Sequence, residues 1–524
     1  MDKGKVYLVG AGPGDPKLIT VRGMEALGRA DAVVFDRLAG PQLLNHARAD
    51  AERIYVGKLP DRHTMKQEEI NRLLVDLALQ GKNVVRLKGG DPTVFGRVGE
   101  EAGLLRENGV EYEIVPGITS AIAVPAYAGI PVTHRDLASS FSVITGHESP
   151  DKLDHSIYWD KVTNATGTLV FLMGVAKLDY ISEQLMKHGR SADTPVALVQ
   201  WGTRAEQRTV TGTLGTIVGK VEEAGLTPPA VIVVGDVVRQ RETLAWVERK
   251  PLFGRRVLVT RARSQASELV ARIDELGGEP YEFPVIETRL PTSDEAVANI
   301  ESALAQAESY DWVMLTSVNG VDYFYRWLDR CGVDIRKFAR AKFAAVGPKT
   351  AEALAARGVR ADLLPESFRA EGLLDSLAGV ISPGQSALLP RGDLARETLP
   401  KELKEKGVRT VEIDVYETAL SAQRDPWLPE MLADGEIHAV TFTSSSTVVN
   451  FIRALKELGV DDPVKALDGV DVACIGPVTA RTAEEHGLTV TIMPDSYTID
   501  GLVEALAASR SKAKGESFDG ISDS

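Results

Sequence analysis

Cysteine is scarce in this chain of 524 residues. Its two cysteines, Cys331 and Cys474, lie far apart in the sequence. This excludes a disulfide-rich secreted domain, and the two thiols lack the close pairing of a cysteine zinc site. We therefore expect a protein of the reducing cytoplasm, with no metal centre.

Long apolar runs and an excess of positive charge are also missing. No stretch approaches the roughly 20 apolar residues of a membrane helix, and the first residues lead into a short strand-like run, not a signal segment. The net charge of −14 disfavours a general nucleic-acid binder. The 44% hydrophobic and 26% charged residues are those of a soluble globular protein, long enough for about three domains.

The first 240 residues alternate short apolar segments with amphipathic ones. Val6–Val9, Val84–Leu87 and Thr168–Met173 are examples of the apolar segments. This alternation predicts a layered α/β domain over residues 1–240. The charged segment 241–253 reads as a linker, and a new strand begins near Arg256. The Ser-, Lys- and Gly-rich residues 509–524 are predicted to be a disordered tail.

Residues 254–508 contain an internal duplication. Asp311–Ser317 matches His438–Ser444, and Val346–Ala351 matches Ile475–Ala480. A repeat at about 130 residues is too long for a solenoid, so it predicts two similar α/β lobes with a cleft between them. A purely structural duplication without a shared site is the alternative.

The segment Lys88–Arg97 (KGGDPTVFGR) follows an apolar strand-like run. Its two glycines let the backbone approach a ligand, and Asp91 lies at a strand's carboxyl end, where open α/β sheets bind ligands. A simple strand-to-helix turn with Asp91 as its cap is the alternative. The segment Gly10–Asp15 (GAGPGD) is not a dinucleotide fingerprint, because Asp15 occupies the third glycine position and Pro13 lacks an N–H group.

Together these two segments resemble the glycine-rich loops of the tetrapyrrole methylases, specifically uroporphyrinogen-III C-methyltransferases. The resemblance extends over residues 4 to about 238. It includes the following strings: Val34–Leu38, Tyr55–Lys58, Val115–Ala121, Gly129–Arg135, Thr145–His147, Phe171–Gly174 and Val199–Thr203.

The resemblance implies S-adenosyl-L-methionine as methyl donor, Asp36 as general base and Lys58 as proton donor. A strand-end cap and a surface lysine are the plain alternatives for these two. The implied cofactor contacts are Pro13, Gly89, Gly90, Asp91, Val94, Thr119, Ser120, Met173 and Gly202. His134, Arg135 and His147 could bind substrate carboxylates or serve the fold.

The second half resembles uroporphyrinogen-III synthase, through Leu315–Gly320, Val346–Thr350 and Val415–Thr418. The family pattern implies one lobe from 254–284 with 419–508 and another from 289–410, joined by two strands. Tyr416 is implied as an acid, although a packed junction tyrosine is equally possible. The expected substrate-binding residues are Thr260, Arg261, Thr316, Ser317, Lys349, Ser444, Ser445 and Thr479.

These resemblances imply a bifunctional enzyme that cyclises hydroxymethylbilane to uroporphyrinogen III and methylates the product twice to precorrin-2. They imply small-molecule partners, no cofactor for the synthase half, and a homodimer formed through the methylase half. Two alternatives stay open. The methylase could act on a later corrin intermediate, with an inactive second half, or the second half could be a ligand-sensing or partner-binding module.

Overall fold

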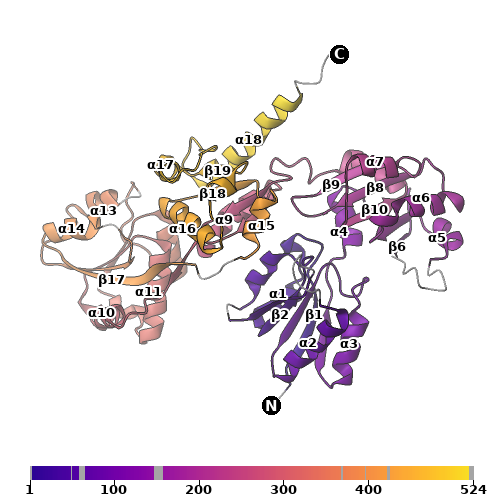
Figure 1. The fold of residues 1–524 in the computed structure, drawn as a ribbon. Coiled ribbons are helices and arrows are strands. Elements are labelled where there is room, and N and C mark those ends of the chain that lie inside the picture. The colour runs from indigo at the N-terminus through magenta and orange to yellow at the C-terminus, as the bar shows by residue number, and fades with distance from the viewer. Residues whose placement is uncertain are drawn as a thin grey trace.

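The computed structural model describes residues 3–48, 50–57, 65–146, 157–367, 370–395, 397–421 and 425–518 (Figure 1). Their strands form four sheets, two in each half of the chain. Helices cover the sheets, so the predicted α/β fold class is confirmed. No helix in this described part is long and apolar enough to cross a membrane.

The first sheet is fully parallel and has the strand order β3-β2-β4-β1-β5. Its central strand β4 is buried along its whole length, because helices cover both faces. The strands are β1 (Lys5–Gly10), β2 (Ala32–Phe35), β3 (Glu52–Tyr55), β4 (Val84–Lys88) and β5 (Glu111–Val115), and the helices are α1 (Val21–Arg29), α2 (Gln67–Leu79) and α3 (Val98–Glu107). The glycine-rich segments follow β1 and β4, so they lie at one edge of the sheet.

The second sheet is mixed and has the order β6-β7-β10-β8-β9. Its strands are β6 (Phe141–Thr145), β7 (Thr168–Leu172), β8 (Pro195–Gln200), β9 (Arg208–Thr213) and β10 (Ala230–Val234). Its helices are α4 (Ser120–Tyr127), α5 (Trp159–Ala165), α6 (Leu178–Lys187) and α7 (Ile217–Glu223). Helix α4 packs Ala121 and Val124 against this sheet, and it directly follows the loop after β5.

The segment expected to be a linker is folded against the first half. Arg241, at the start of α8 (Arg241–Leu244), donates to the Ala128 carbonyl at 2.6 Å and pairs with Glu248. The Trp246 indole donates to the Ala126 carbonyl at 3.1 Å. Charged and aromatic side chains of the predicted linker therefore make contacts with the first half.

Lobe one of the second half has a parallel sheet of order β12-β11-β18-β19. The strands are β11 (Arg256–Val259), β12 (Glu279–Glu282), β18 (Ala439–Phe442) and β19 (Asp471–Cys474). The helices are α9 (Arg263–Glu275), α15 (Leu428–Ala433), α16 (Ser445–Glu457), α17 (Pro477–Glu485) and α18 (Ile499–Phe518). Because α18 reaches Phe518, residues 509–518 are helical where the composition predicted disorder, and residues 519–524 lie outside the described part.

Lobe two has the order β13-β17-β16-β14-β15, in which only β13 is antiparallel to its neighbour among the described strands. The strands are β13 (Ile286–Arg289), β14 (Trp312–Leu315), β15 (Lys342–Ala345), β16 (Ser386–Gly392) and β17 (Arg409–Leu420). The helices are α10 (Asp294–Ala305), α11 (Val318–Cys331), α12 (Pro348–Ala356), α13 (Ala370–Leu377) and α14 (Thr398–Glu405).

Each copy of the duplicated unit is divided between the two lobes. The first copy places β11, α9 and β12 in lobe one, and β14 and β15 in lobe two. The second copy does the reverse, with β16, α14 and β17 in lobe two, and β18 and β19 in lobe one. The chain changes lobe after β12 and again after β17, so the two lobes are linked by two stretches of backbone.

Candidate active sites

Three glycine-containing loops meet at the carboxyl ends of β1, β4 and β5. Gly12 and Gly90 exchange backbone hydrogen bonds of 3.2 and 2.7 Å. A Cβ atom added to Gly117 would lie 2.3 Å from the Gly90 carbonyl oxygen. The loops therefore touch through bare backbone, and this close approach requires glycine at position 117.

Asp91 fastens two of these loops together. Its buried carboxylate accepts hydrogen bonds from the backbone N–H of Gly117 at 2.8 Å and of Thr93 at 2.7 Å. Both oxygens are thus engaged inside the protein. Asp91 consequently shapes the loop, and any contribution to cofactor binding comes through that shape.

Open space lies beside Gly90. Its φ of 72° is a left-handed conformation, and an added Cβ would meet nothing closer than Thr119 and Ser120, both at 3.9 Å. Thr119 caps α4 by accepting from the Ala121 N–H. A helix N-terminus and a glycine backbone thus face one space, and this arrangement fits the predicted adenosylmethionine contacts.

The other predicted cofactor contacts lie on neighbouring loops. Pro13 stands between two positive-φ glycines after β1, and Val94 packs against the core beneath α4. A Cβ on Gly89 would meet the Leu38 side chain at 2.5 Å, so Gly89 allows the loops after β2 and β4 to approach each other.

Backbone strain marks the same region. The non-glycine residues with positive φ among the described positions are Phe95, Arg97, Met173, Trp201 and Thr203. Such conformations cost free energy and gather at functional sites. Two predicted cofactor contacts lie in or beside this set. Met173 has a positive φ and follows β7. Gly202 stands between Trp201 and Thr203 after β8, and a Cβ atom there would clash with Val124 at 2.4 Å. Sequence reasoning missed the strain, because a dihedral angle leaves no direct mark on a sequence.

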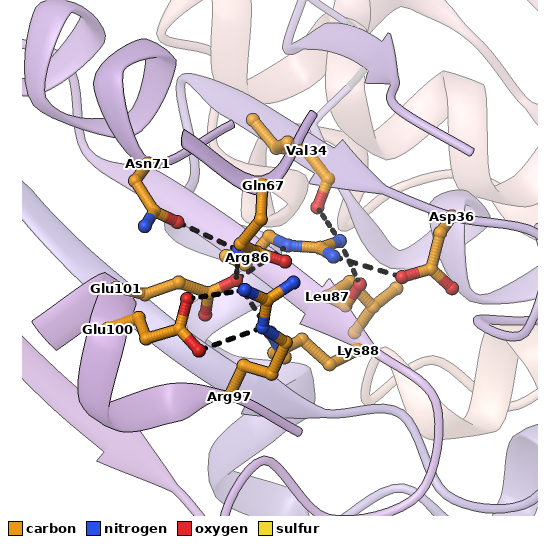
Figure 2. A network of polar contacts seen from close by, with 10 residues as sticks. All are labelled: Val34, Asp36, Gln67, Asn71, Arg86, Leu87, Lys88, Arg97, Glu100 and Glu101. Atoms are coloured by element: carbon orange, nitrogen blue, oxygen red, sulfur yellow. Dashed lines mark hydrogen bonds and ion pairs between the residues drawn. The ribbon is translucent and has the colours of Figure 1, made fainter. Parts of the chain in front are cut away.

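Asp36 ends β2 and is held by a buried network (Figure 2). Its Oδ2 atom pairs with Arg86 Nη2 on the neighbouring strand β4 at 3.0 Å, and its Oδ1 atom accepts from the Leu38 N–H at 3.1 Å. Arg86 in turn approaches Glu101 of α3, with Nε and Oε1 3.5 Å apart. The carboxylate is thus fixed in orientation and is one-quarter exposed.

Glu101 is the fully buried centre of this network. Its Oε1 atom lies 2.6 Å from Lys88 Nζ and 3.1 Å from Gln67 Nε2. Burial lowers the pKa of Lys88, and the charge of Glu101 opposes that shift. Sequence reasoning did not single out Arg86, Lys88 or Glu101. The available signal was two basic residues inside an otherwise apolar strand, which need a buried partner.

Four further residues were predicted for the methylase half. Lys58 and His147 lie outside the described residues. His134 uses its Nδ1 atom to accept from the Asp136 N–H at 3.1 Å, and therefore holds a local turn. Arg135 in that turn is exposed.

Tyr416 of β17 lies at the carboxyl edge of the lobe-two sheet. Its hydroxyl group is 3.5 Å from the Ser317 hydroxyl, and its ring packs against Tyr323 at 5.3 Å between centroids. Burial raises the pKa of Tyr416, so the phenol stays protonated at neutral pH and can donate. Ser317 also caps α11 by accepting from the Gly320 N–H at 3.0 Å.

Two further predicted residues of lobe two are exposed at this edge. Thr316 follows β14, and Lys349 stands in the first turn of α12. Lys349 Nζ lies 2.7 Å from Glu268 of α9, so this ion pair bridges the two lobes. Lys349 therefore already has an anionic partner.

Lobe one brings its predicted residues to the equivalent edge, with two corrections. Ser444 caps α16, and the Ser445 hydroxyl accepts from Thr482 at 2.8 Å. Thr479 of α17 is buried, so its side chain is not open to a substrate. Thr260, however, is completely buried and donates to the Thr441 carbonyl at 2.7 Å, so it joins two strands and presents no open donor. Burial lowers the pKa of the neighbouring Arg261.

Comparison with known proteins accounts for both halves. The family model for Tetrapyrrole (Corrin/Porphyrin) Methylases matches residues 5–218, and the model for Uroporphyrinogen-III synthase HemD matches residues 267–504. The porphyrin biosynthesis protein HemD of Ruminiclostridium josui is 39% identical over 507 residues, which cover 97% of this chain and 98% of that protein. The chain belongs to both families. Both are enzyme families of tetrapyrrole biosynthesis.

Two relatives of the first half are also similar. The uroporphyrinogen-III C-methyltransferase of Priestia megaterium is 57% identical over 235 residues, covering 45% of this chain and 98% of that protein. The crystal structure of uroporphyrin-III C-methyl transferase from Thermus thermophilus complexed with S-adenosylhomocysteine is 41% identical, covers 45% of this chain and 99% of that one, and has a TM-score of 0.39. In the described part of the chain, no three His, Cys, Asp or Glu side chains are grouped as metal ligands.

Proposed function

We propose that this chain is a bifunctional enzyme that performs two consecutive steps of tetrapyrrole synthesis. The second half cyclises hydroxymethylbilane to uroporphyrinogen III, with inversion of ring D. The first half then methylates uroporphyrinogen III at C2 and C7 to give precorrin-2, for sirohaem or cobalamin synthesis. One observation carries the proposal: a single chain contains both families, and the product of one family is the substrate of the other.

S-adenosyl-L-methionine would lie between the Gly89–Gly90 loop and the N-terminus of α4, with Met173 and Gly202 on the opposing loops. Bound there, it supplies a methyl group already activated on a sulfonium. The open space beside Gly90 and the glycine contacts that a Cβ would block support this site. The loop glycines exclude side chains from the space, and Asp91 keeps the loops together.

Methylation of a pyrrole carbon leaves a cation that must lose a proton. Asp36 is suited to accept it, because its carboxylate is oriented by Arg86 and is partly exposed toward a cavity. General-base catalysis contributes about a hundredfold or more to a rate. Lys58 stays a predicted proton donor.

Ring closure begins with loss of a hydroxyl group from ring A of hydroxymethylbilane. The protonated phenol of Tyr416 can donate to that leaving group. Ser317, Ser444 and Ser445, at the first turns of α11 and α16, would bind substrate carboxylates together with backbone N–H groups. Thr260 is left out of this set because it is buried.

The decisive experiment gives purified full-length protein hydroxymethylbilane and labelled S-adenosyl-L-methionine. We expect type III product in excess over type I, and two labelled methyl groups in each product molecule. Release of uroporphyrinogen without the type III isomer would favour a non-catalytic second half. In a parallel assay that offers uroporphyrinogen III and a later corrin intermediate separately, methyl transfer to the corrin alone would favour the alternative methylase.

Asp36→Asn tests the proposed base within the same assay. We expect methylation to slow about a hundredfold or more while S-adenosylhomocysteine binding by calorimetry stays unchanged. Asp179→Asn, an equivalent change at an exposed position of α6, is the matched control. Unchanged turnover in Asp36→Asn would remove this residue from the mechanism. A homodimer formed through the first half stays a further prediction, which analytical ultracentrifugation can check.

A further inference from the structure

Lobe one of the synthase half lies directly on the methylase half (Figure 1). Two contacts join the loop after β1 and the segment after β2 to lobe one. Lys17 Nζ lies 2.5 Å from Asp274 of α9, and Gln42 Nε2 donates to the Pro280 carbonyl of β12 at 2.7 Å. These contacts start from the edge of the sheet that carries the glycine-rich loops.

Arg256 is the charged centre of this junction. Its side chain is 3% exposed and binds three carboxylates: Glu206 of the methylase half at 2.6 Å, and Glu279 and Glu436 of lobe one, both at 2.8 Å. Glu279 also accepts from the backbone N–H of Ala205 at 2.8 Å. A buried cation with partners from both halves gives the docking a defined geometry.

The junction encloses the space in front of Asp36. The rings of Tyr55 and Trp427 meet across it, with centroids 5.0 Å apart. Asp36 lines a cavity of about 140 Å³ whose far wall is built from lobe one. An adjoining cavity of about 260 Å³ lies between the same aromatic rings but does not include Asp36.

This space is too small for the methylase substrate. Pockets for drug-sized ligands occupy about 300–1,000 Å³, and a tetrapyrrole with eight carboxylates is larger than most such ligands. The wall from lobe one carries Glu430 and Asp434 as well as the carboxylates bound to Arg256. Arg37, Arg204 and Arg256 also line the cavity, so the obstacle to uroporphyrinogen III is the volume that lobe one occupies, not the charge of the wall.

We propose that lobe one of the synthase is a docked cover over the methylase substrate site, and that it must move away before uroporphyrinogen III can reach Asp36. This inference rests on the proposed function. The surface that holds the cover is polar and charged, which is typical of interfaces between domains that move relative to each other. A protein that is mostly closed binds its substrate with an affinity reduced by the fraction that is open.

A reversible cross-link tests the cover. Lys17→Cys with Asp274→Cys, in a Cys331→Ser background, is treated with a short bis-methanethiosulfonate that joins the two thiols and is released by reductant. We expect high yields of the internal link and at least a tenfold loss of uroporphyrinogen III methylation, recovered on reduction. The control pair, Glu52→Cys with Lys82→Cys, replaces an ion pair of 2.7 Å within the methylase half and should methylate equally with and without the link.

The outcomes separate the two proposals. A linked protein that methylates as fast as its reduced form overturns the cover, and so does a failure of the junction pair to link as readily as the control pair. The yield of the cross-link measures docking of lobe one independently of enzymatic activity. If the unmodified chain does not methylate uroporphyrinogen III, the proposed function fails, while the yield still decides whether lobe one docks.

A charge reversal at Glu206 gives a second test, which opens the junction instead of locking it. Glu206→Lys puts a cation against Arg256 and should open the junction. We expect a several-fold lower KM for uroporphyrinogen III and a lower linking yield when this change is added to the cysteine pair. Glu222→Lys on α7, far from lobe one in Figure 1, makes the same change of charge and should alter neither value. Identical values for both variants would count against the cover.

Discussion

Replacing Glu101 with glutamine should destabilise the first sheet by about 3–5 kcal/mol, the usual effect of removing one partner of a buried ion pair. Glutamine keeps the volume and can still accept from Lys88, so the change isolates the charge. Glu101 is fully buried, and Lys88 and Arg86 are more than nine-tenths buried. Two opposite charges 4 Å apart interact by about 4 kcal/mol at the effective dielectric constant of protein sites, which agrees with this range.

The loss of stability should depend on pH, because the unpaired Lys88 can become neutral by releasing a proton. Burial already holds the pKa of Lys88 below its ordinary value of 10.5, and loss of Glu101 lowers that pKa further. Between the folded pKa and 10.5 the unfolded chain binds more protons, so the stability of the variant rises with pH. Neutralising Lys88 costs at most about 5 kcal/mol at pH 7 and about 2 kcal/mol at pH 9, which limits the part of the stability loss that Lys88 causes at each pH.

Pulse proteolysis in urea at pH 7 and pH 9, with surviving peptides of the first half identified by mass spectrometry, measures both effects. Glu100→Gln is the matched control on the same helix. Glu100 is half exposed and pairs with Arg97 at the surface, where solvent screening leaves only a few tenths of a kcal/mol. The reasoning is refuted if both variants lose equally, or if the Glu101→Gln defect is as large at pH 9 as at pH 7.

Three further predictions concern other parts of the chain. Gly90→Val should weaken S-adenosylhomocysteine binding at least tenfold, because the φ of 72° disfavours a branched side chain and that side chain would fill the open space beside it. Calorimetry measures this affinity, and a wild-type value would exclude this loop from the site. Tyr416→Phe should slow ring closure and lower the ratio of type III to type I product. The control Tyr325→Phe removes a hydroxyl that has no hydrogen-bond partner in the described structure, and it should change neither value. Equal product ratios for the two variants would assign Tyr416 to packing. Burial raises the pKa of the Cys474 thiol to about 12, so iodoacetamide at pH 8 should modify the partly exposed Cys331 and reach Cys474 only after unfolding, as peptide mass spectrometry would report.

Local features of the fold could be predicted from the sequence. Val84–Leu87 is a continuous apolar run, and it forms β4, the strand buried on both faces. Gly89 and Gly90 were expected to let the backbone approach a ligand, and the structure adds that Gly90 also exchanges backbone hydrogen bonds with Gly12. Such features depend on the period of apolar residues and on the absence of a Cβ, both of which can be read directly.

Contacts that depend on strand order could not be predicted. Asp36 and Arg86 meet because β2 and β4 are neighbours in the sheet, although β3 and α2 separate them along the chain. Thr260 was expected to be an open donor at a strand end, but β18 lies beside it and its Thr441 carbonyl accepts the hydrogen bond of the Thr260 hydroxyl. Trp427 reaches Tyr55 across two domains, which no local pattern indicates.

The division of each duplicated copy between the two lobes sets an order for folding on the ribosome. Lobe two is complete once β17 has emerged, but lobe one needs β18 and β19 in addition to β11 and β12, which were made much earlier. The apolar faces of β11 and β12 therefore stay exposed while the whole of lobe two is synthesised. The finished methylase half already stands beside them and carries the surface that Arg256 and Glu279 bind. That neighbour can bind Arg256 and Glu279 before lobe one is complete, so the junction can fix the position of β11 and β12 during synthesis.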